Sequence, residues 1–220
     1  MLYVYAFAER PATLPEVDGI GGSGLAVEPV GDIDAVVSDV DGESVGASEE
    51  AILAHARVVE ALAERCDAVL PARFGRGYAD AESLRRAAAP RVGDLREALE
   101  RVRGSVELGI RVLAPARPQR RGATASGREY MVTRLEARRR AEQVAEQLDA
   151  PLGAIARAGT RSVSVTPQLL LTAAYLVDRA DVDRFRATVE RLQHEHPDLT
   201  IACTGPWPPY SFATVEGAEG

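Results

Sequence analysis

Hydrophobic and polar positions follow two different periods along this chain, which predicts a protein of mixed helix and sheet. Residues 105–114 alternate between apolar and polar side chains, as expected for a strand with one buried face. Residues 181–194 instead space their apolar side chains three and four apart, which is the period of an amphipathic helix. The positions that define these two patterns are Val106, Leu108, Ile110 and Val112 in the first, and Val182, Phe185, Val189 and Leu192 in the second.

The same criteria assign the rest of the chain. Strand-forming runs occupy residues 2–7, 25–30, 33–40, 161–167, 169–178 and 199–205, and a short extended piece covers 69–75. Helical patterns cover 48–65, 80–89, 92–103 and 128–157. The expected buried stripes are Ile52, His55, Val59 and Leu62 on the first helix, and Val144, Leu148, Leu152 and Ile155 on the last.

The order of these elements predicts an α+β fold with two domains. From residue 105 onward the order is β-α-β-β-α-β, which is typical of the ferredoxin-like fold, an antiparallel sheet with two helices on one face. We therefore expect an N-terminal α+β domain at 1–104 and a ferredoxin-like domain at 105–220. The C-terminal end of the second domain is a separate segment rich in proline and aromatic residues.

The charge of the chain argues against a general nucleic-acid-binding protein. The net charge of the 220 residues is −7, whereas such proteins usually have a basic surface. Residues 1–104 contain 11 Arg and 19 acidic residues, and residues 105–220 contain 15 Arg and 14 acidic residues. The local exception is 111–140, where nine Arg accompany two acidic residues. Tyr130 is the only aromatic residue there, so the interleaved aromatic residues that stack on bases are lacking. We expect a solvated Arg-rich loop at 115–127, with a binding patch as the alternative.

The sequence also predicts a soluble cytoplasmic protein. Cys66 and Cys203 are the only cysteines, with no CxxC pair, so a reducing compartment is expected. The residues at the N-terminus lack the basic start and long apolar stretch of a signal peptide. The longest nearly apolar run, residues 169–177, is too short to cross a bilayer as a helix.

No set of residues in the sequence forms a recognisable catalytic or metal site. The glycine-rich residues 19–24 (GIGGSG) are followed by a strand rather than by the helix that a phosphate-binding loop needs, so we expect a turn. His55 is expected in the core, donating to a backbone carbonyl, and an anion site with Arg57 and Arg73 is the alternative. We expect no catalytic residues, no metal and no cofactor.

Three stretches of the chain carry a family resemblance. They are residues 55–75 (HARVVEALAERCDAVLPARFG), residues 102–112 (VRGSVELGIRV), and the C-terminal region from LVDRADVDRFRATVERL to TGPWPPYSF. Together they resemble the GvpF/GvpL family of gas vesicle proteins over nearly the whole chain. The matching positions are His55, Leu70, Pro71, Arg73, Phe74 and Gly75, followed by Gly205, Pro206, Trp207, Pro208, Pro209, Tyr210 and Phe212.

This resemblance implies a non-enzymatic accessory protein that supports the formation of gas vesicles, the gas-filled compartments that give cells buoyancy. It implies contact with the hydrophobic shell protein GvpA, other gas vesicle accessory proteins as further possible partners, and a location in the cytoplasm in association with gas vesicles. A minor structural component of the vesicle wall is the alternative, and a ligand-binding or enzymatic ferredoxin-like module is less favoured. The sequence does not distinguish F-like from L-like members.

Residues 204–212 (TGPWPPYSF) are the strongest candidate for an interaction site. Their prolines favour an extended polyproline II conformation, which loses little entropy on docking, and their aromatic side chains can bury large areas. We expect this segment to dock on the N-terminal domain beside PARFG and to fix the angle between the domains, with a binding surface for GvpA as the alternative. The candidate partner-binding or interdomain residues are Arg73, Phe74, Gly75, Trp207, Pro208, Tyr210 and Phe212.

Overall fold

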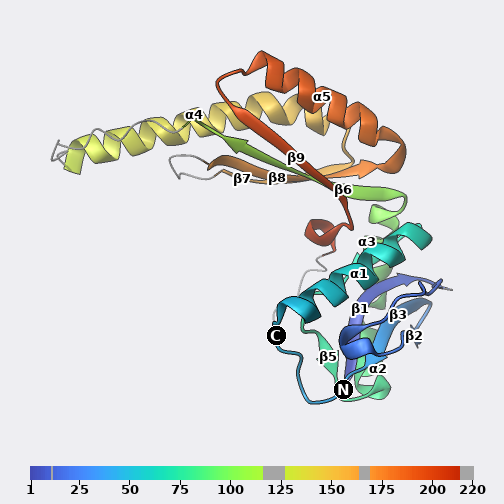
Figure 1. The fold of residues 1–220 in the computed structure, drawn as a ribbon. Helices are drawn as coiled ribbons and strands as arrows, with labels where there is room; N and C mark the ends of the chain where they lie inside the picture. Colours follow the sequence, from blue (N-terminus) through green and yellow to red (C-terminus); the bar gives the residue numbers. More distant parts are fainter. Residues whose placement is uncertain (11, 116–126, 164–168, 214–220) are drawn as a thin grey trace. The chain divides into compact units, whose positions relative to one another are not determined.

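The computed structural model describes residues 1–10, 12–115, 127–163 and 169–213, and the chain divides into two compact units. Unit 1 contains Met1–Val106 and the segment that begins at Trp207, and unit 2 contains Glu107–Pro206. Strands Ser105–Leu113 (β6) and Thr200–Trp207 (β9) carry the chain out of unit 1 and back into it (Figure 1). The C-terminal segment is therefore part of the same unit as the N-terminus.

Unit 1 is built on a sheet whose central strand is almost completely buried. The strand order is β2-β3-β1-β4, and the short β5 also pairs with β1. Strand β1 is antiparallel to β3, β4 and β5, and β2 is antiparallel to β3. The strands are Leu2–Glu9 (β1), Ala26–Val30 (β2), Ile33–Asp39 (β3), Val69–Pro71 (β4) and Gly77–Tyr78 (β5).

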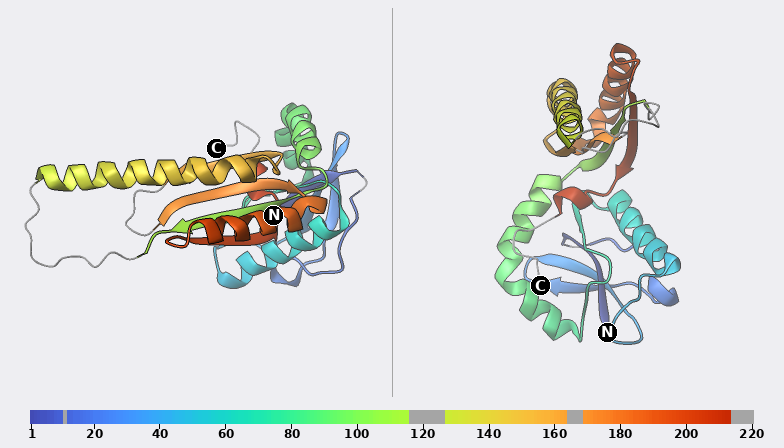
Figure 2. Two further views of the ribbon diagram at one scale, coloured as in Figure 1. Left: turned by 90° about the horizontal axis from the view of Figure 1, so that it is seen from above. Right: turned by 90° about the vertical axis from the view of Figure 1, so that its left-hand side faces the viewer.

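Helices cover both faces of this sheet. Helix α1 (Glu49–Arg65) lies on one face, while α2 (Ala81–Ala88) and α3 (Val92–Val102) lie on the other (Figure 2). The N-cap of α1 is Ser48, whose hydroxyl accepts a hydrogen bond from the backbone N–H of Ala51. The N-cap of α2 is Asp80, whose carboxylate accepts from the N–H of Ser83.

The buried face of α1 differs from the predicted stripe at one position. His55, Val59 and Leu62 are buried as expected, but Ile52 is exposed. The helix packs its small side chains Ala51 and Ala54 against the sheet, in the same cluster as two tyrosines of β1. Because the small side chains of Ala51 and Ala54 face the sheet, the apolar pair between them, Ile52 and Leu53, turns outward. The prediction for Ile52 was therefore wrong.

The glycine-rich residues 19–24 form a turn around the hydroxyl group of Tyr5. A short 3-10 helix, Ile20–Gly22 (η1), lies within them, and strand β2 follows. The backbone N–H of Ile20 donates to the Tyr5 hydroxyl at 2.8 Å, and the same hydroxyl is 2.8 Å from the Ser38 hydroxyl. Gly19 passes so close to Tyr5 that an added Cβ would lie 2.4 Å from the hydroxyl oxygen. The predicted turn is thus confirmed, and it packs closely against the Tyr5 hydroxyl.

Unit 2 combines one sheet with two helices. The strand order is β7-β8-β6-β9, and α4 and α5 lie on the same face of the sheet (Figures 1 and 2). In addition to β6 and β9, the elements are Gly127–Gly153 (α4), Ala158–Val163 (β7), Leu169–Asp178 (β8) and Val182–Glu195 (α5). Strand β7 is antiparallel to β8.

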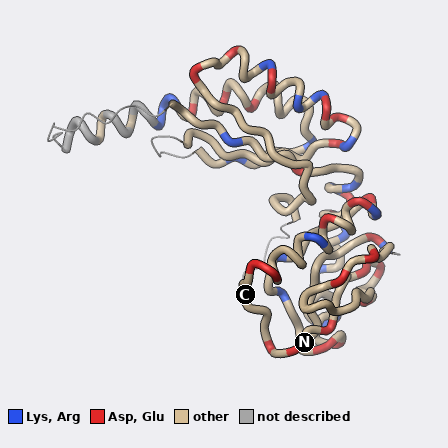
Figure 3. The backbone as a smooth tube through the Cα atoms, in the orientation of Figure 1, with Lys and Arg blue, Asp and Glu red and all other residues tan. Residues whose placement is uncertain are grey.

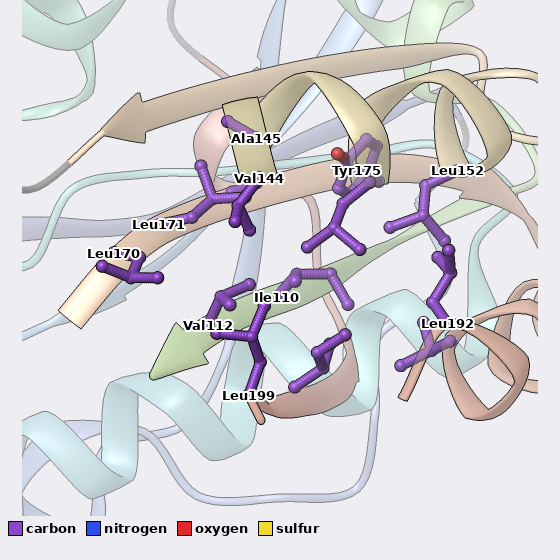
Figure 4. Close-up of a cluster of buried hydrophobic side chains, with 14 of the residues drawn as sticks. Ile110, Val112, Val144, Ala145, Leu152, Leu170, Leu171, Tyr175, Leu192 and Leu199 are labelled. Carbon is purple, nitrogen blue, oxygen red and sulfur yellow. The ribbon is translucent and has the colours of Figure 1, made fainter. Parts of the chain in front are cut away.

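The core of unit 2 lies between this sheet and its helices. Figure 4 shows side chains of the strands, including Ile110, Val112 and Leu171, meeting Leu152 of α4 and Leu192 of α5. The four alternating positions predicted for residues 105–114 are all buried, as are Val144, Leu148 and Leu152. Ile155 lies beyond the end of α4 but still packs against this core.

Several element boundaries differ from the predictions. Helix α4 ends at Gly153 rather than 157, and β7 begins earlier than expected, at Ala158. Strand β9 continues through Pro206 to Trp207, although the sequence predicted that the strand ends at residue 205. Residues 116–126, which form most of the Arg-rich loop, and residues 164–168 lie outside the described residues.

The close contact at Gly19 leads to a stability prediction. We expect Gly19→Ala to lower the free energy of unfolding by about 1–3 kcal/mol, because the new methyl group must displace the Tyr5 hydroxyl from its buried hydrogen bonds. Chemical denaturation measures this change. Gly24→Ala is the matched control, since nothing lies within 4 Å of a Cβ at that position. Equal effects of the two substitutions would contradict the packing described here.

Candidate functional site

Two segments singled out by the sequence lie together in unit 1. The first is the turn at Arg73–Gly75, which follows β4, and the second is the C-terminal segment from Trp207 to Phe212. The second ends in a short 3-10 helix, Tyr210–Phe212 (η4), and η4 contacts β4. The chain thus brings residues more than 130 positions apart to one region, which we call the C-terminal surface.

The C-terminal segment has a buried part and an exposed part. Pro208 and Pro209 are buried, and Phe212 is half-buried. In contrast, Trp207 is 46% exposed and Tyr210 is 41% exposed. The backbone is fixed locally, because the N–H of Tyr210 donates to the carbonyl of Pro208 at 2.8 Å, and the N–H of Phe212 donates to that of Pro209 at 3.1 Å. The prolines therefore anchor the segment while two large aromatic side chains remain accessible.

This conformation differs from the extended polyproline segment that the sequence predicted. Residues up to Trp207 belong to β9, and the following prolines lead into the η4 turn. The segment is therefore strand followed by 3-10 helix. Sequence reasoning underestimated the strand because proline lacks the N–H that a ladder uses, but an edge strand tolerates proline and β9 is at the edge of its sheet.

The surroundings of Tyr210 shift the pKa of its phenol group. Burial raises the pKa of Tyr210 to about 12, and the nearby charge of Glu60 on α1 acts in the same direction. Tyr3 of the central strand also contributes to this shift. A tyrosine is protonated at neutral pH in any case, and the raised pKa keeps this phenol a hydrogen-bond donor under more basic conditions as well.

The turn at Arg73–Gly75 presents one side chain to solvent and one to the core. Arg73 is exposed, whereas Phe74 packs against the aromatic cluster, with its ring centroid 5.8 Å from that of His55. Gly75 has a φ of +85°, a conformation that favours glycine. Its N–H donates to the hydroxyl of Tyr3 at 3.1 Å, which ties the turn to the central strand.

His55 takes part in a hydrogen-bond chain with this turn. Its Nδ1 lies 2.9 Å from the hydroxyl oxygen of Tyr3. The same oxygen accepts the Gly75 N–H, so this hydroxyl links the turn to His55. Burial lowers the pKa of His55, and the backbone of Ala72 acts in the opposite direction. His55 is thus a core residue as expected, and it has a tyrosine hydroxyl at Nδ1 in addition to the backbone of Ala72 beside it.

Other candidate groups offer little chemistry. Among the described residues, no three His, Cys, Asp or Glu side chains are grouped so that they could hold a metal ion. Burial raises the pKa of the Cys203 thiol, which disfavours the reactive thiolate. No helix within the described ranges is both long and apolar enough to cross a membrane.

Sequence reasoning did not identify the residues of β1 and α1 that interact with the turns and with Tyr210. Tyr3 and Tyr5 were assigned only to a strand, and Glu60 was not singled out within the helix predicted at 48–65. The alternation in residues 2–7 contained a usable signal, because it places both tyrosines on the same face, where they pack against α1. Their hydroxyl groups then require partners, and the turns provide them.

Removing the Tyr3 hydroxyl should destabilise unit 1. We expect Tyr3→Phe to lower the free energy of unfolding by about 1–3 kcal/mol, because it leaves the Gly75 N–H and His55 Nδ1 without their partner. Urea denaturation measures the change. In the control variant Tyr78→Phe, the lost hydroxyl accepts only from Arg76, and we expect a change within about 0.5 kcal/mol. A Tyr3→Phe protein as stable as this control would contradict the proposed network.

His55 should make stability depend on pH in a defined direction. Its pKa is lowered in the folded state, so the unfolded chain, with a pKa of about 6.5, binds the proton more readily. The contribution of His55 to the free energy of unfolding is therefore fully present above about pH 6.5, and it is lost as the pH decreases toward the pKa of the folded state. The slope for one proton is at most about 1.4 kcal/mol per pH unit.

The measurement compares unfolding free energies at about pH 7.5 and 5.5. We expect the loss between these values to be smaller in His55→Gln than in the wild-type protein. His194→Gln is the control, because that ring is exposed, and it should keep the wild-type dependence. An unchanged loss in His55→Gln would overturn this role.

Comparison with known proteins connects these features to a biological process. The sequence model of the family described as "Gas vesicle synthesis protein GvpL/GvpF" matches residues 1–214. Gas vesicle protein F2 of Halobacterium salinarum is 31% identical, and the alignment covers 99% of this chain and 94% of that protein. Gas vesicle protein L of a Streptomyces species is 33% identical, with coverage of 97% and 92%.

Solved structures agree at the level of the fold. The crystal structure of the gas vesicle protein GvpF from Anabaena sp. PCC7120 superposes with a TM-score of 0.85 at 20% identity, covering 100% of this chain and 98% of that one. The structure of GvpF from Microcystis aeruginosa gives a TM-score of 0.80 at 22% identity. The match to the family model spans almost the whole sequence and agrees with the resemblance carried by residues 55–75 and 204–212. The chain therefore belongs to the GvpL/GvpF family of gas vesicle synthesis proteins.

Proposed function

We propose that this protein supports gas vesicle formation by binding the hydrophobic shell protein GvpA through the C-terminal surface. Membership of the family gives the chain a role related to gas vesicles. A shell that holds gas requires subunits with a large apolar surface, and such chains aggregate unless they are covered. A protein that covers them keeps them competent to assemble, and it needs only binding for this, with no catalysis and no cofactor.

The observation that carries this proposal is the exposure of Trp207 and Tyr210 on an anchored backbone. Trp and Tyr are enriched among the residues that dominate binding energy at interfaces. Here they stand on a segment whose prolines are buried, so little conformational entropy remains to be lost on binding. Exposed Arg73, from the neighbouring turn, adds a positive charge that can bind an acidic group of the partner.

The architecture of the chain supports the same assignment. We assign unit 2 to the ferredoxin-like class, on the basis of its β-α-β-β-α-β order, its strand order β7-β8-β6-β9, and the position of both helices on one face. We propose two domains, 1–104 and 105–220, with the C-terminal tail returning to the N-terminal domain. The protein would act in the cytoplasm, in association with gas vesicles.

A minor structural component of the wall is the alternative function. Washing purified vesicles with denaturant separates the two possibilities, because an accessory protein that escorts subunits should be removed. Retention of the chain on washed vesicles would favour the structural role.

The binding proposal is tested by capturing GvpA from the same organism with the tagged full chain. We expect Trp207→Ala and Tyr210→Ala each to reduce the captured GvpA by about tenfold or more, because both remove large exposed aromatic groups. The thermal midpoint of each variant is measured in parallel and should change little. Leu113→Ala, which removes an exposed apolar side chain of β6, is the control and should bind normally.

One outcome needs a further variant. If a tail substitution lowers both binding and the thermal midpoint, the tail clamps unit 1, and Arg73→Ala decides whether the same surface also binds. Arg73 is exposed, so its replacement should not affect folding. Normal capture by Arg73→Ala, Trp207→Ala and Tyr210→Ala alike would contradict the proposed surface.

A further inference from the structure

The first half of α1 carries an exposed apolar pair in strongly acidic surroundings. Ile52 and Leu53 both point to solvent, and Leu53 is 51% exposed. Residues 39–53 contain five acidic residues and no basic one. Figure 3 shows acidic residues at the beginning of α1, where Glu49 and Glu50 are exposed.

The first half of α4 carries exposed apolar side chains in basic surroundings. This part of the helix extends past the strands of its own sheet (Figures 1 and 2). Met131, Val132 and Leu135 are exposed there, the last at 51%. Residues 128–140 contain five Arg and two acidic residues, and Arg138 and Arg139 are exposed. The second apolar patch is thus bordered by charge of the opposite sign.

The two helices also match in spacing. On α1, the positions Glu49, Leu53 and Ala56 follow one another at intervals of four and three residues and lie on one face. On α4, reading backwards from Arg139, the positions Leu135 and Val132 follow at the same intervals. Antiparallel packing therefore places Glu49 opposite Arg139. It also places Leu53 opposite Leu135, and Ala56 opposite Val132. Parallel packing would place the charged end of each helix against the apolar part of the other.

We propose that copies of this chain associate head to tail, with α1 of one copy packed antiparallel to the first half of α4 of the next. We name the α1 side, Glu49–Ala56, the acidic face and the α4 side, Met131–Arg139, the basic face. A second copy fits because each chain carries one face of each kind, with complementary charge and spacing. The argument for this association does not rest on binding of the shell protein.

The geometry predicts a weak and open-ended association. Contact between two short helix faces buries less than the roughly 1,200 Å² typical of stable complexes, so we expect dissociation constants on the order of 10–100 μM. A contact between two different faces of the same chain does not close unless the rotation between copies completes a ring. Short chains of copies should therefore form as the protein concentration rises.

Sedimentation velocity of the full chain over a range of concentrations measures this association. We expect the average mass to rise with concentration at low salt, and the dissociation constant to increase severalfold on going from about 50 to 500 mM NaCl, because the charge pairs are screened. Leu53→Asp and Leu135→Asp should each abolish association. Both residues are exposed, so circular dichroism should show an unchanged fold. Leu113→Asp is the control and should associate normally.

Two combinations of variants make the test specific. An equimolar mixture of Leu53→Asp and Leu135→Asp should give dimers and nothing larger, since each protein keeps one intact face. Glu49→Arg should weaken association at least about fivefold, and adding Arg139→Glu to the same chain should restore it, because the charge pair is re-formed in the opposite sense.

Several results would overturn the proposal. A wild-type protein that stays monomeric at about 0.5 mM would overturn it. This includes a protein in which the acidic and basic faces of the same chain pair with each other, because such a protein also stays monomeric. Association that survives both Leu53→Asp and Leu135→Asp would show that other surfaces are responsible. Failure of the charge exchange to restore association would exclude the antiparallel pairing.

Discussion

Two tyrosine hydroxyl groups inside unit 1 hold two of its turns in place. Tyr3 and Tyr5 stand on the fully buried central strand, where a hydroxyl without a partner would cost free energy. Each is satisfied by the backbone N–H of a glycine-containing turn and by a second side chain. Tyr5 holds Ile20, and Tyr3 holds Gly75. The two turns lie where they do because the buried hydroxyl groups of Tyr3 and Tyr5 require hydrogen-bond partners.

The C-terminal surface depends on this arrangement. The turn at Arg73–Gly75 is tied to Tyr3, and η4 packs beside the strand that leads into that turn. Glu60 and Tyr3 both contribute to the raised pKa of Tyr210. The Tyr3 hydroxyl thus holds the turn, and the contact of η4 with β4 places the second segment beside it. Buried prolines then make this surface rigid without covering its aromatic side chains.

Periodicity predicted the elements whose packing is regular, and failed where packing is local. The alternation of Val106 to Val112 and the helical spacing of Phe185, Val189 and Leu192 appear in the structure as predicted, because each faces a continuous core. Ile52 was placed wrongly, because the small side chains of Ala51 and Ala54 face the sheet in its place. Strand β5 was missed, because two residues are too few for any pattern to be recognised.

The candidate site was likewise predicted only in part from the sequence. The composition of residues 204–212 was sufficient to identify an unusual segment, and the family resemblance connected it with PARFG. Neither could show that Pro208 and Pro209 face inward while Trp207 and Tyr210 stay exposed, because burial is decided by residues distant in the sequence. The contribution of Glu60 was equally invisible, since its proximity to Tyr210 arises only when the chain returns to unit 1.

The proposed acidic face on α1 ends near Glu60, a residue that influences the pKa of Tyr210 on the C-terminal surface. Ala56 is the last residue of the acidic face, and Glu60, which influences Tyr210, follows one helical turn later. Under the two proposals, a partner that extends past this turn from one surface would meet a partner bound at the other. Binding of the shell protein and association of copies would then be linked, and by thermodynamic reciprocity each would change the affinity of the other by the same factor. If each binding event weakened the other, a copy that binds the shell protein would leave the chain of copies, or the shell protein would bind only to the copy at the end of a chain.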